Sequence, residues 1–180
     1  MLAIIGGSGL YALEGLQLEQ EHQMTTPFGE PSAPILQGVF AGQPVLFLAR
    51  HGTQHSYLPS EVNYRANIFA LKKLGARRVV GISAAGSLRM EIKPGELALA
   101  AQYFDHTRGK RAYSFFGKGV VAHVSTANPA CPSLSADIAR AAGRSGESMH
   151  EGKIYGCVEG PRLGTRAESF FLRDAAQCDL

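Results

Sequence analysis

The architecture of this 180-residue chain follows from one stretch, Arg77-Arg78-Val79-Val80-Gly81-Ile82-Ser83-Ala84-Ala85-Gly86-Ser87-Leu88. It begins as a short apolar run with β-branched residues, which is typical of a buried strand. It then changes to Ser, Ala and Gly, small residues that let other groups approach the backbone closely. Ligands of open α/β sheets bind at the carboxyl ends of strands. We therefore expect a bound small molecule near residues 83–87; the alternative is a tight turn without a ligand.

Two other stretches have the same form. One is Leu2-Ala3-Ile4-Ile5 followed by Gly6-Gly7-Ser8-Gly9, and the other is Val45-Leu46-Phe47-Leu48-Ala49 followed by Arg50-His51-Gly52. Together the three strand ends offer backbone N–H groups, hydroxyls, an arginine and a histidine, a combination that suits an anion. We expect them to converge on one anion pocket in which Arg50 pairs with phosphate. The alternative for Arg50 is a structural salt bridge.

Strands and helices alternate along the rest of the chain. Residues 35–40 and 45–49 predict a hairpin, and residues 62–74 predict an amphipathic helix with Ser60 as a candidate cap. Further strands are expected at residues 97–104, 120–124 and 153–158, and further helices at 133–143, capped by Ser133, and at 165–176. This alternation predicts an α/β fold with a mixed central β-sheet flanked by helices.

Length and composition place further bounds on the chain. At 180 residues it is long enough for one domain, residues 1–180, with a core that needs no staples. The net charge is +3 and the basic residues are scattered, so no nucleic-acid partner is expected. Cys131, Cys157 and Cys178 lack the spacing of a disulfide framework or a zinc site. No signal peptide or long apolar run is present, so we expect a cytoplasmic protein without a membrane partner.

The glycine-rich stretch after the first strand, residues 7–12, also fits the dinucleotide-binding pattern G-x-G-x-x-G/A. That fingerprint requires an acidic residue at the end of a second strand, about 20 residues further on. The corresponding region here is a Pro-rich loop around Glu30. An anion-binding loop therefore explains the glycines better than a nicotinamide or flavin site.

Three histidines are candidates for a functional role. His51 and His55 could be acid/base groups or metal ligands. Two histidines four residues apart usually need a helix to face one metal, and this loop is not helical, so no metal is expected. His123 lies among Val and Ala in a predicted strand, where the residues alone favour a hydrogen-bonded core histidine.

A carboxylate and a guanidinium flank the turn at residues 159–162. Glu159 could bond to ligand hydroxyls or to an amine, and the alternative is an internal pair with Arg162 or Arg166. The chain shows no nucleophile elbow and no Ser-His-Asp order. We therefore assign no catalytic acid, base or nucleophile.

Six segments of the chain together carry a family resemblance that none of them carries alone. They are Ile4-Ile5-Gly6-Gly7-Ser8-Gly9-Leu10, Thr26-Pro27-Phe28-Gly29-Glu30-Pro31-Ser32, Leu48-Ala49-Arg50-His51-Gly52, Val62-Asn63-Tyr64-Arg65-Ala66-Asn67, Ser83-Ala84-Ala85-Gly86-Ser87-Leu88-Arg89 and Glu159-Gly160-Pro161-Arg162, continued by Ala167-Glu168-Ser169. In this order they resemble the trimeric purine nucleoside phosphorylase family, most closely its 5′-methylthioadenosine phosphorylase branch.

The resemblance implies a purine nucleoside phosphorylase-like fold and phosphorolysis of an N-glycosidic bond, with inorganic phosphate as co-substrate and no cofactor. The phosphate-binding positions it implies are Ser8, Arg50, His51 and Ser83. The nucleoside-binding positions are Ala84, Ala85, Gly86, Glu159, Leu163 and His123. Leu163 matches a position where this branch often has Phe packed on the purine. His123 matches a residue that reaches the 5′ end of the nucleoside in a neighbouring subunit, which replaces the core interpretation.

The resemblance also contains one departure. Family members continue past the point that matches Leu180, through a Met beneath the ribose, a Thr on phosphate and the Asp or Asn residues that read the purine. We therefore expect this chain to be a fragment or an incomplete product, without the groups that select adenine or hypoxanthine.

The function expected from the resemblance is phosphorolysis of 5′-methylthioadenosine to the purine base and 5-methylthioribose 1-phosphate, by a homotrimer or a multiple of it. A phosphorylase of 5′-methylthioinosine or of 6-oxopurine nucleosides is one alternative. An inactive module that binds only phosphate and ribose is the other.

Overall fold

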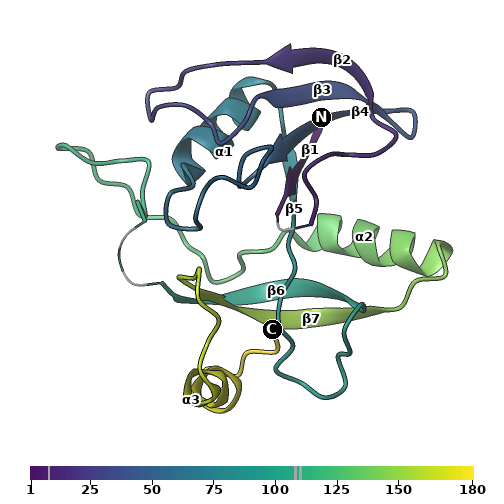
Figure 1. Cartoon of the computed structure of the whole chain (residues 1–180), viewed down its shortest axis with the longest axis vertical. Helices are drawn as coiled ribbons and strands as arrows, with labels where there is room; N and C mark the ends of the chain where they lie inside the picture. The colour runs from purple at the N-terminus through teal and green to yellow at the C-terminus, as the bar shows by residue number, and fades with distance from the viewer. Residues whose placement is uncertain (8, 108, 110) are drawn as a thin grey trace. The chain divides into compact units, whose positions relative to one another are not determined.

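The computed structural model describes residues 1–7, 9–107, 109 and 111–180 of the chain (Figure 1). They form two compact units. The first consists of Met1–Ala84 and Gly109–Gly117, and the second of Ala85–Arg108 and Lys118–Leu180. No helix in the described part of the chain is long and apolar enough to cross a membrane.

The first unit is built on a five-stranded sheet with the strand order β2-β3-β4-β1-β5 (Figure 1). Its strands are β1 (Leu2–Gly6), β2 (Gln17–His22), β3 (Ile35–Phe40), β4 (Gln43–Ala49) and β5 (Arg78–Ile82). Strand β1 runs parallel to β4 and β5, whereas β3 runs antiparallel to β2 and β4. The predicted α/β class, mixed sheet and hairpin are therefore confirmed, although β4 begins at Gln43 rather than at residue 45.

Strand β4 is buried on both faces of this sheet. On one face Leu46 and Leu48 pack with Leu71 of helix α1 (Tyr64–Lys73). On the other face Phe47 packs beneath loop residues that include Leu10. A near-continuous apolar run suits such a strand, because both of its faces lie in the core.

Helix α1 begins later than the sequence predicted. Its cap is Asn63, whose side-chain oxygen accepts a hydrogen bond from Ala66 N at 3.2 Å, so the prediction of Ser60 is wrong. A short amide side chain at this position satisfies one of the free N–H groups of the first turn. Asn63 also donates to Phe28 O at 2.7 Å, which ties the helix start to the Pro-rich loop before β3.

The second unit contains a parallel pair of strands and its helical segments. They are β6 (Leu97–His106), β7 (Met149–Val158), α2 (Pro132–Arg144), α3 (Arg166–Phe170) and the π-helical turn η1 (Phe171–Ala175). Helix α2 begins at Pro132 after Cys131, so Ser133 is not its cap. Proline suits the first helical position because its ring fixes φ and it has no N–H to satisfy.

The strand predicted at residues 120–124 does not form. This segment has no strand partner, and Val121 and Val124 are 78% and 80% exposed. A β-strand needs a neighbouring strand for its backbone groups, and a short apolar run alone does not supply one. His123 therefore lies in an irregular, exposed segment.

Candidate functional site

The carboxyl ends of three neighbouring strands meet at one edge of the first unit's sheet. Strands β4, β1 and β5 are adjacent and parallel, so their ends point the same way. Backbone hydrogen bonds continue past the strands: Gly7 N donates to Ile82 O at 2.8 Å, and Arg50 N donates to Gly6 O at 2.9 Å. The structure thus brings Gly7, Arg50 and Ser83 together at one place.

Arg50 lies across these strand ends. Its Nη2 donates to Ser83 Oγ at 3.2 Å, and its Nε donates to His51 Nε2 at 3.3 Å. Within the described part of the chain Arg50 forms no ion pair with a carboxylate, so the salt-bridge alternative is not realised there. A guanidinium with spare donors at the ends of parallel strands is suited to a planar or tetrahedral oxyanion.

His51 is the buried member of the cluster, with 5% of its surface exposed. Its Nδ1 lies 2.9 Å from Tyr57 O, so both ring nitrogens have partners. Burial lowers the pKa of His51 below its ordinary value, and the positive charges of Arg50, His55 and Arg111 lower it further, against the opposing effect of the Tyr57 carbonyl. We infer a neutral imidazole at neutral pH.

His55 and Tyr11 extend the cluster outward. The Tyr11 hydroxyl lies 3.0 Å from His55 Nδ1, and the His55 ring lies 4.9 Å from the His51 ring. The hydrogen bond between Tyr11 and His55 could not be predicted from the sequence, because the two residues are 44 positions apart. Ser8, the remaining predicted phosphate ligand, lies outside the described residues.

The predicted nucleoside-binding residues fall in both units. Ala84 ends one segment of the first unit, and its carbonyl oxygen accepts from Ser83 Oγ at 3.3 Å. Ala85 and Gly86 begin the second unit and are exposed. Glu159, Leu163 and His123 also belong to the second unit, where Glu159 follows β7 directly and Leu163 is 90% exposed. Their roles stay predictions.

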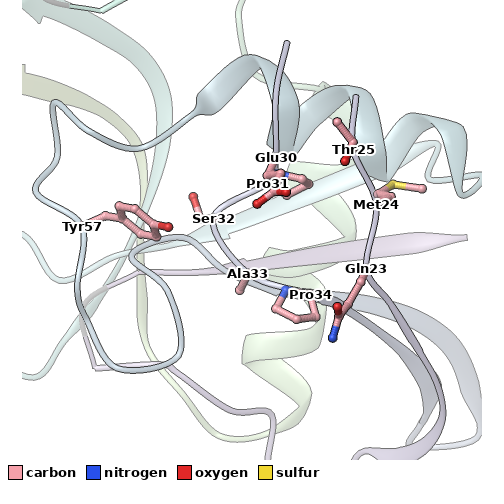
Figure 2. Close-up of a pocket in the computed structure, with 9 residues that line it drawn as sticks. All are labelled: Gln23, Met24, Thr25, Glu30, Pro31, Ser32, Ala33, Pro34 and Tyr57. Carbon is pink, nitrogen blue, oxygen red and sulfur yellow. The ribbon is translucent and has the colours of Figure 1, made fainter. Parts of the chain in front are cut away.

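A pocket of about 400 Å³ lies elsewhere in the first unit and contains none of the predicted site residues. Its lining residues are Gln23, Met24, Thr25, Glu30, Pro31, Ser32, Ala33, Pro34 and Tyr57. Figure 2 shows the Tyr57 ring on the side opposite Gln23, Met24 and Thr25. Ser32 is held from behind by buried Asn67, which accepts from Ser32 N at 2.8 Å and donates to Ser32 Oγ at 2.9 Å. The Glu30 carboxylate disfavours phosphate here, because like charges repel.

No group of three or more potential metal ligands occurs among the residues that the structure describes.

Comparison with known proteins identifies the family. The model of the phosphorylase superfamily matches residues 1–179. The chain belongs to this superfamily. The S-methyl-5′-thioadenosine phosphorylase of Geobacter sulfurreducens is 50% identical over 173 residues, which cover 96% of this chain and 60% of that protein. The enzyme of the same name from Thermofilum pendens is 49% identical over 172 residues, 96% of this chain and 65% of that protein.

Solved structures of phosphorylases agree with this assignment. A methylthioadenosine phosphorylase from an antarctic soil metagenomic library matches with a TM-score of 0.92 and 45% identity, over 99% of this chain and 62% of that one. A methylthioadenosine phosphorylase from Schistosoma mansoni, solved with tubercidin, matches with a TM-score of 0.92 and 33% identity, over 99% of this chain and 70% of that one. The chain spans about 60–65% of the length of the first curated relatives.

The turn after β7 is held by Glu168. Arg162 donates from Nη2 and Nη1 to the two Glu168 oxygens at 2.6 and 2.8 Å. Glu168 Oε2 also accepts from Thr165 N at 2.7 Å, while Thr165 Oγ1 accepts from Glu168 N, which makes a capping box at the start of α3. The sequence left an internal pair with Arg162 or Arg166 as the alternative role of Glu159, and in the structure Arg162 pairs with Glu168.

The Glu168 network should make stability depend on pH. Hydrogen bonds from Arg162, followed by that from Thr165 N, lower the pKa of Glu168 to about 2. A lowered pKa means that the carboxylate stabilises the fold above its ordinary pKa, and that this contribution is lost as the pH falls towards about 2. In urea unfolding, Glu168→Gln should therefore lower the midpoint at pH 7, and the difference from wild type should shrink in acid.

The matched control is Glu19→Gln, which neutralises an exposed carboxylate on β2. It should leave the midpoint at pH 7 close to that of wild type. Equal midpoints for wild type and Glu168→Gln at pH 7 would show that the network adds no stability.

Proposed function

We propose that this chain carries the phosphate-binding residues of a phosphorylase that cleaves 5′-methylthioadenosine to adenine and 5-methylthioribose 1-phosphate. The observation that carries the proposal is Arg50, a guanidinium without an acidic partner in the described chain, placed where three strand ends meet. Relatives with about half of their aligned residues identical bear the name of this activity.

The chemistry needs few special groups from the protein. Inorganic phosphate attacks the anomeric carbon, a C–O bond forms, and the C–N bond to the purine breaks. Because the nucleophile is already an anion, no strong base is required, and no metal or organic cofactor is invoked. The contribution of Arg50 and Ser83, with Ser8 as a further proposed donor, is to hold phosphate under the sugar and to offset its charge.

The nucleoside is proposed to bind next to the phosphate, through the residues that the family resemblance implies. Ala84, Ala85 and Gly86 would line the ribose and base, because small residues let the substrate approach the backbone. Glu159 would bind substrate hydroxyls or an amine, Leu163 would pack on the purine, and His123 would reach the 5′ end from a neighbouring subunit.

The test is phosphate-dependent release of a purine base by the full-length protein. Adenine release from 5′-methylthioadenosine that requires phosphate supports the proposal. A preference for 5′-methylthioinosine or inosine would move the assignment to a 6-oxopurine enzyme. Phosphate binding without base release from any of these nucleosides would leave a binding module and contradict the proposed activity.

A homotrimer, or a multiple of it, is proposed as the working assembly in the cytoplasm, where nucleosides and phosphate are metabolites. Its support is an aromatic surface on the first unit, where Tyr113 and Phe116 are 67% and 53% exposed and Phe115 packs edge-on against Phe28. Aromatic residues are enriched in interface cores. Sedimentation of the full-length protein should give a trimer or a multiple of three, and a monomer that still turns over substrate would contradict a role for His123 of a neighbouring subunit.

A further inference from the structure

The two bonds of the His51 ring define its protonation state. A guanidinium has only donors, so the 3.3 Å contact from Arg50 Nε requires a lone pair on His51 Nε2. The Tyr57 carbonyl has only acceptor capacity, so the 2.9 Å contact requires a proton on His51 Nδ1. Both contacts agree on one neutral tautomer, with the proton on Nδ1. An imidazolium would set an N–H of His51 against the N–H of Arg50.

The loop after β4 fixes the Tyr57 carbonyl in place. Tyr57 N donates back to His51 O at 3.2 Å, so the two residues are joined by a reciprocal pair of bonds. Between them Gly52 has φ of +79°, and a Cβ there would lie 2.9 Å from Ser56 Oγ and 3.3 Å from the Tyr57 ring. This close packing leaves the imidazole little freedom to turn away from Arg50.

We propose that His51 is a positioning residue, whose Nδ1-protonated imidazole holds the Arg50 guanidinium in the orientation that binds phosphate. The inference rests on the proposed phosphate role of Arg50 and concerns the imidazole ring of His51. The Tyr57 carbonyl orients His51, His51 Nε2 accepts from Arg50 Nε, and the Nη2 group at the other end of the guanidinium reaches Ser83 Oγ. One side of the guanidinium is thereby fixed, and Nη1 has no acceptor in the described chain.

The charges around His51 give this arrangement a defined pH dependence. The groups that face it are Arg50 and His55 from its own loop, Arg111 from the segment 109–117, and the Tyr57 carbonyl. Burial and these cations lower the pKa of His51, so the acceptor on Nε2 persists through neutral pH. As the pH falls through the lowered pKa, Nε2 gains a proton, the bond from Arg50 is lost, and phosphate affinity should fall.

The tautomer can be measured without catalysis. In the full-length protein labelled with ¹⁵N-histidine, the two ring nitrogens of His51 give different shifts for the protonated and unprotonated states. We expect a protonated Nδ1 and an unprotonated Nε2 at pH 7.5. A protonated Nε2, in either the neutral ring or an imidazolium, would overturn the proposal, because Arg50 could no longer donate to it.

Two substitutions test the roles of the two ring nitrogens of His51 separately. His51→Asn keeps a donor near Nδ1 and removes the acceptor at Nε2, whereas His51→Gln places an amide oxygen near Nε2. The dissociation constant for inorganic phosphate, measured by calorimetry, should rise roughly ten- to a hundred-fold in His51→Asn, the effect of one hydrogen bond to a charged group. In His51→Gln the dissociation constant should stay within about threefold of wild type, because the amide oxygen can still accept the hydrogen bond from Arg50 Nε.

The control is His22→Asn, the same change on β2, where the histidine bonds to Gln37 instead. It should bind phosphate as wild type does. The proposal is overturned if His51→Asn binds phosphate like His22→Asn, or if His51→Gln loses as much affinity as His51→Asn. Failure of the wild type to release adenine would count against the proposed function alone, since the tautomer and the phosphate titrations need no turnover.

Discussion

Arg50→Ala should lower the proposed phosphate-dependent turnover of 5′-methylthioadenosine by roughly 30- to 1000-fold, equivalent to about 2–4 kcal/mol of transition-state stabilisation. The reason is that Arg50 is the cation of the strand-end cluster and its contacts in the described chain are to His51 and Ser83, neither of them a carboxylate. An unneutralised guanidinium should give most of its binding energy to phosphate. Steady-state kinetics at varied phosphate would show the loss mainly in kcat/KM for phosphate, with a smaller change in KM for the nucleoside.

Two variants sharpen this prediction. Arg50→Lys keeps the charge but not the planar fork that binds Ser83 and His51 together, so it should recover only part of the activity. Arg77→Ala removes an arginine just before β5, at the strand end opposite to the cluster, and should behave as wild type. Unchanged phosphate kinetics in Arg50→Ala would remove Arg50 from the phosphate site.

The strand-end cluster could be predicted because its signals are local. Each of the three strands is an apolar run that ends in small or cationic residues, and adjacent parallel strands necessarily end on the same edge of a sheet. Arg50 and Ser83 therefore lie in contact, as the sequence predicted, although they are 33 positions apart. Helix α1 could also be predicted, because its apolar residues have helical spacing and Gly75 follows its last turn.

The misses have a common physical cause, since each depended on a partner distant in the chain. Residues 120–124 have the composition of a strand but no neighbouring strand to pair with. Arg162 has acidic residues on both sides in sequence, and the choice of Glu168 depends on the capping box formed with Thr165. The bond between His51 and the Tyr57 carbonyl could not be expected either, because a backbone acceptor carries no signature of residue type.

The second large effect is expected at Gly7, where the backbone lies against the cluster. A Cβ at this position would lie 2.5 Å from Arg50 Nη2 and 2.6 Å from Ile82 O. The Ile82 carbonyl cannot move freely, because it accepts the hydrogen bond from Gly7 N that joins the ends of β1 and β5. A methyl group therefore has to displace both the guanidinium and a backbone strand, which is overpacking of a rigid site.

Gly7→Ala should consequently lower the free energy of unfolding by about 1–3 kcal/mol, and it should weaken phosphate binding because Arg50 loses its position. The matched control is Gly81→Ala on β5, where a Cβ would meet nothing within 4 Å. Neither glycine has a positive φ, so both substitutions reduce the freedom of the unfolded chain to a similar extent and differ only in what the methyl group meets. Urea unfolding and phosphate titration of the two variants would separate the steric effect from the general cost of replacing a glycine. If Gly7→Ala matched Gly81→Ala in both measurements, the site would not depend on the close approach of the Gly7 backbone to Arg50.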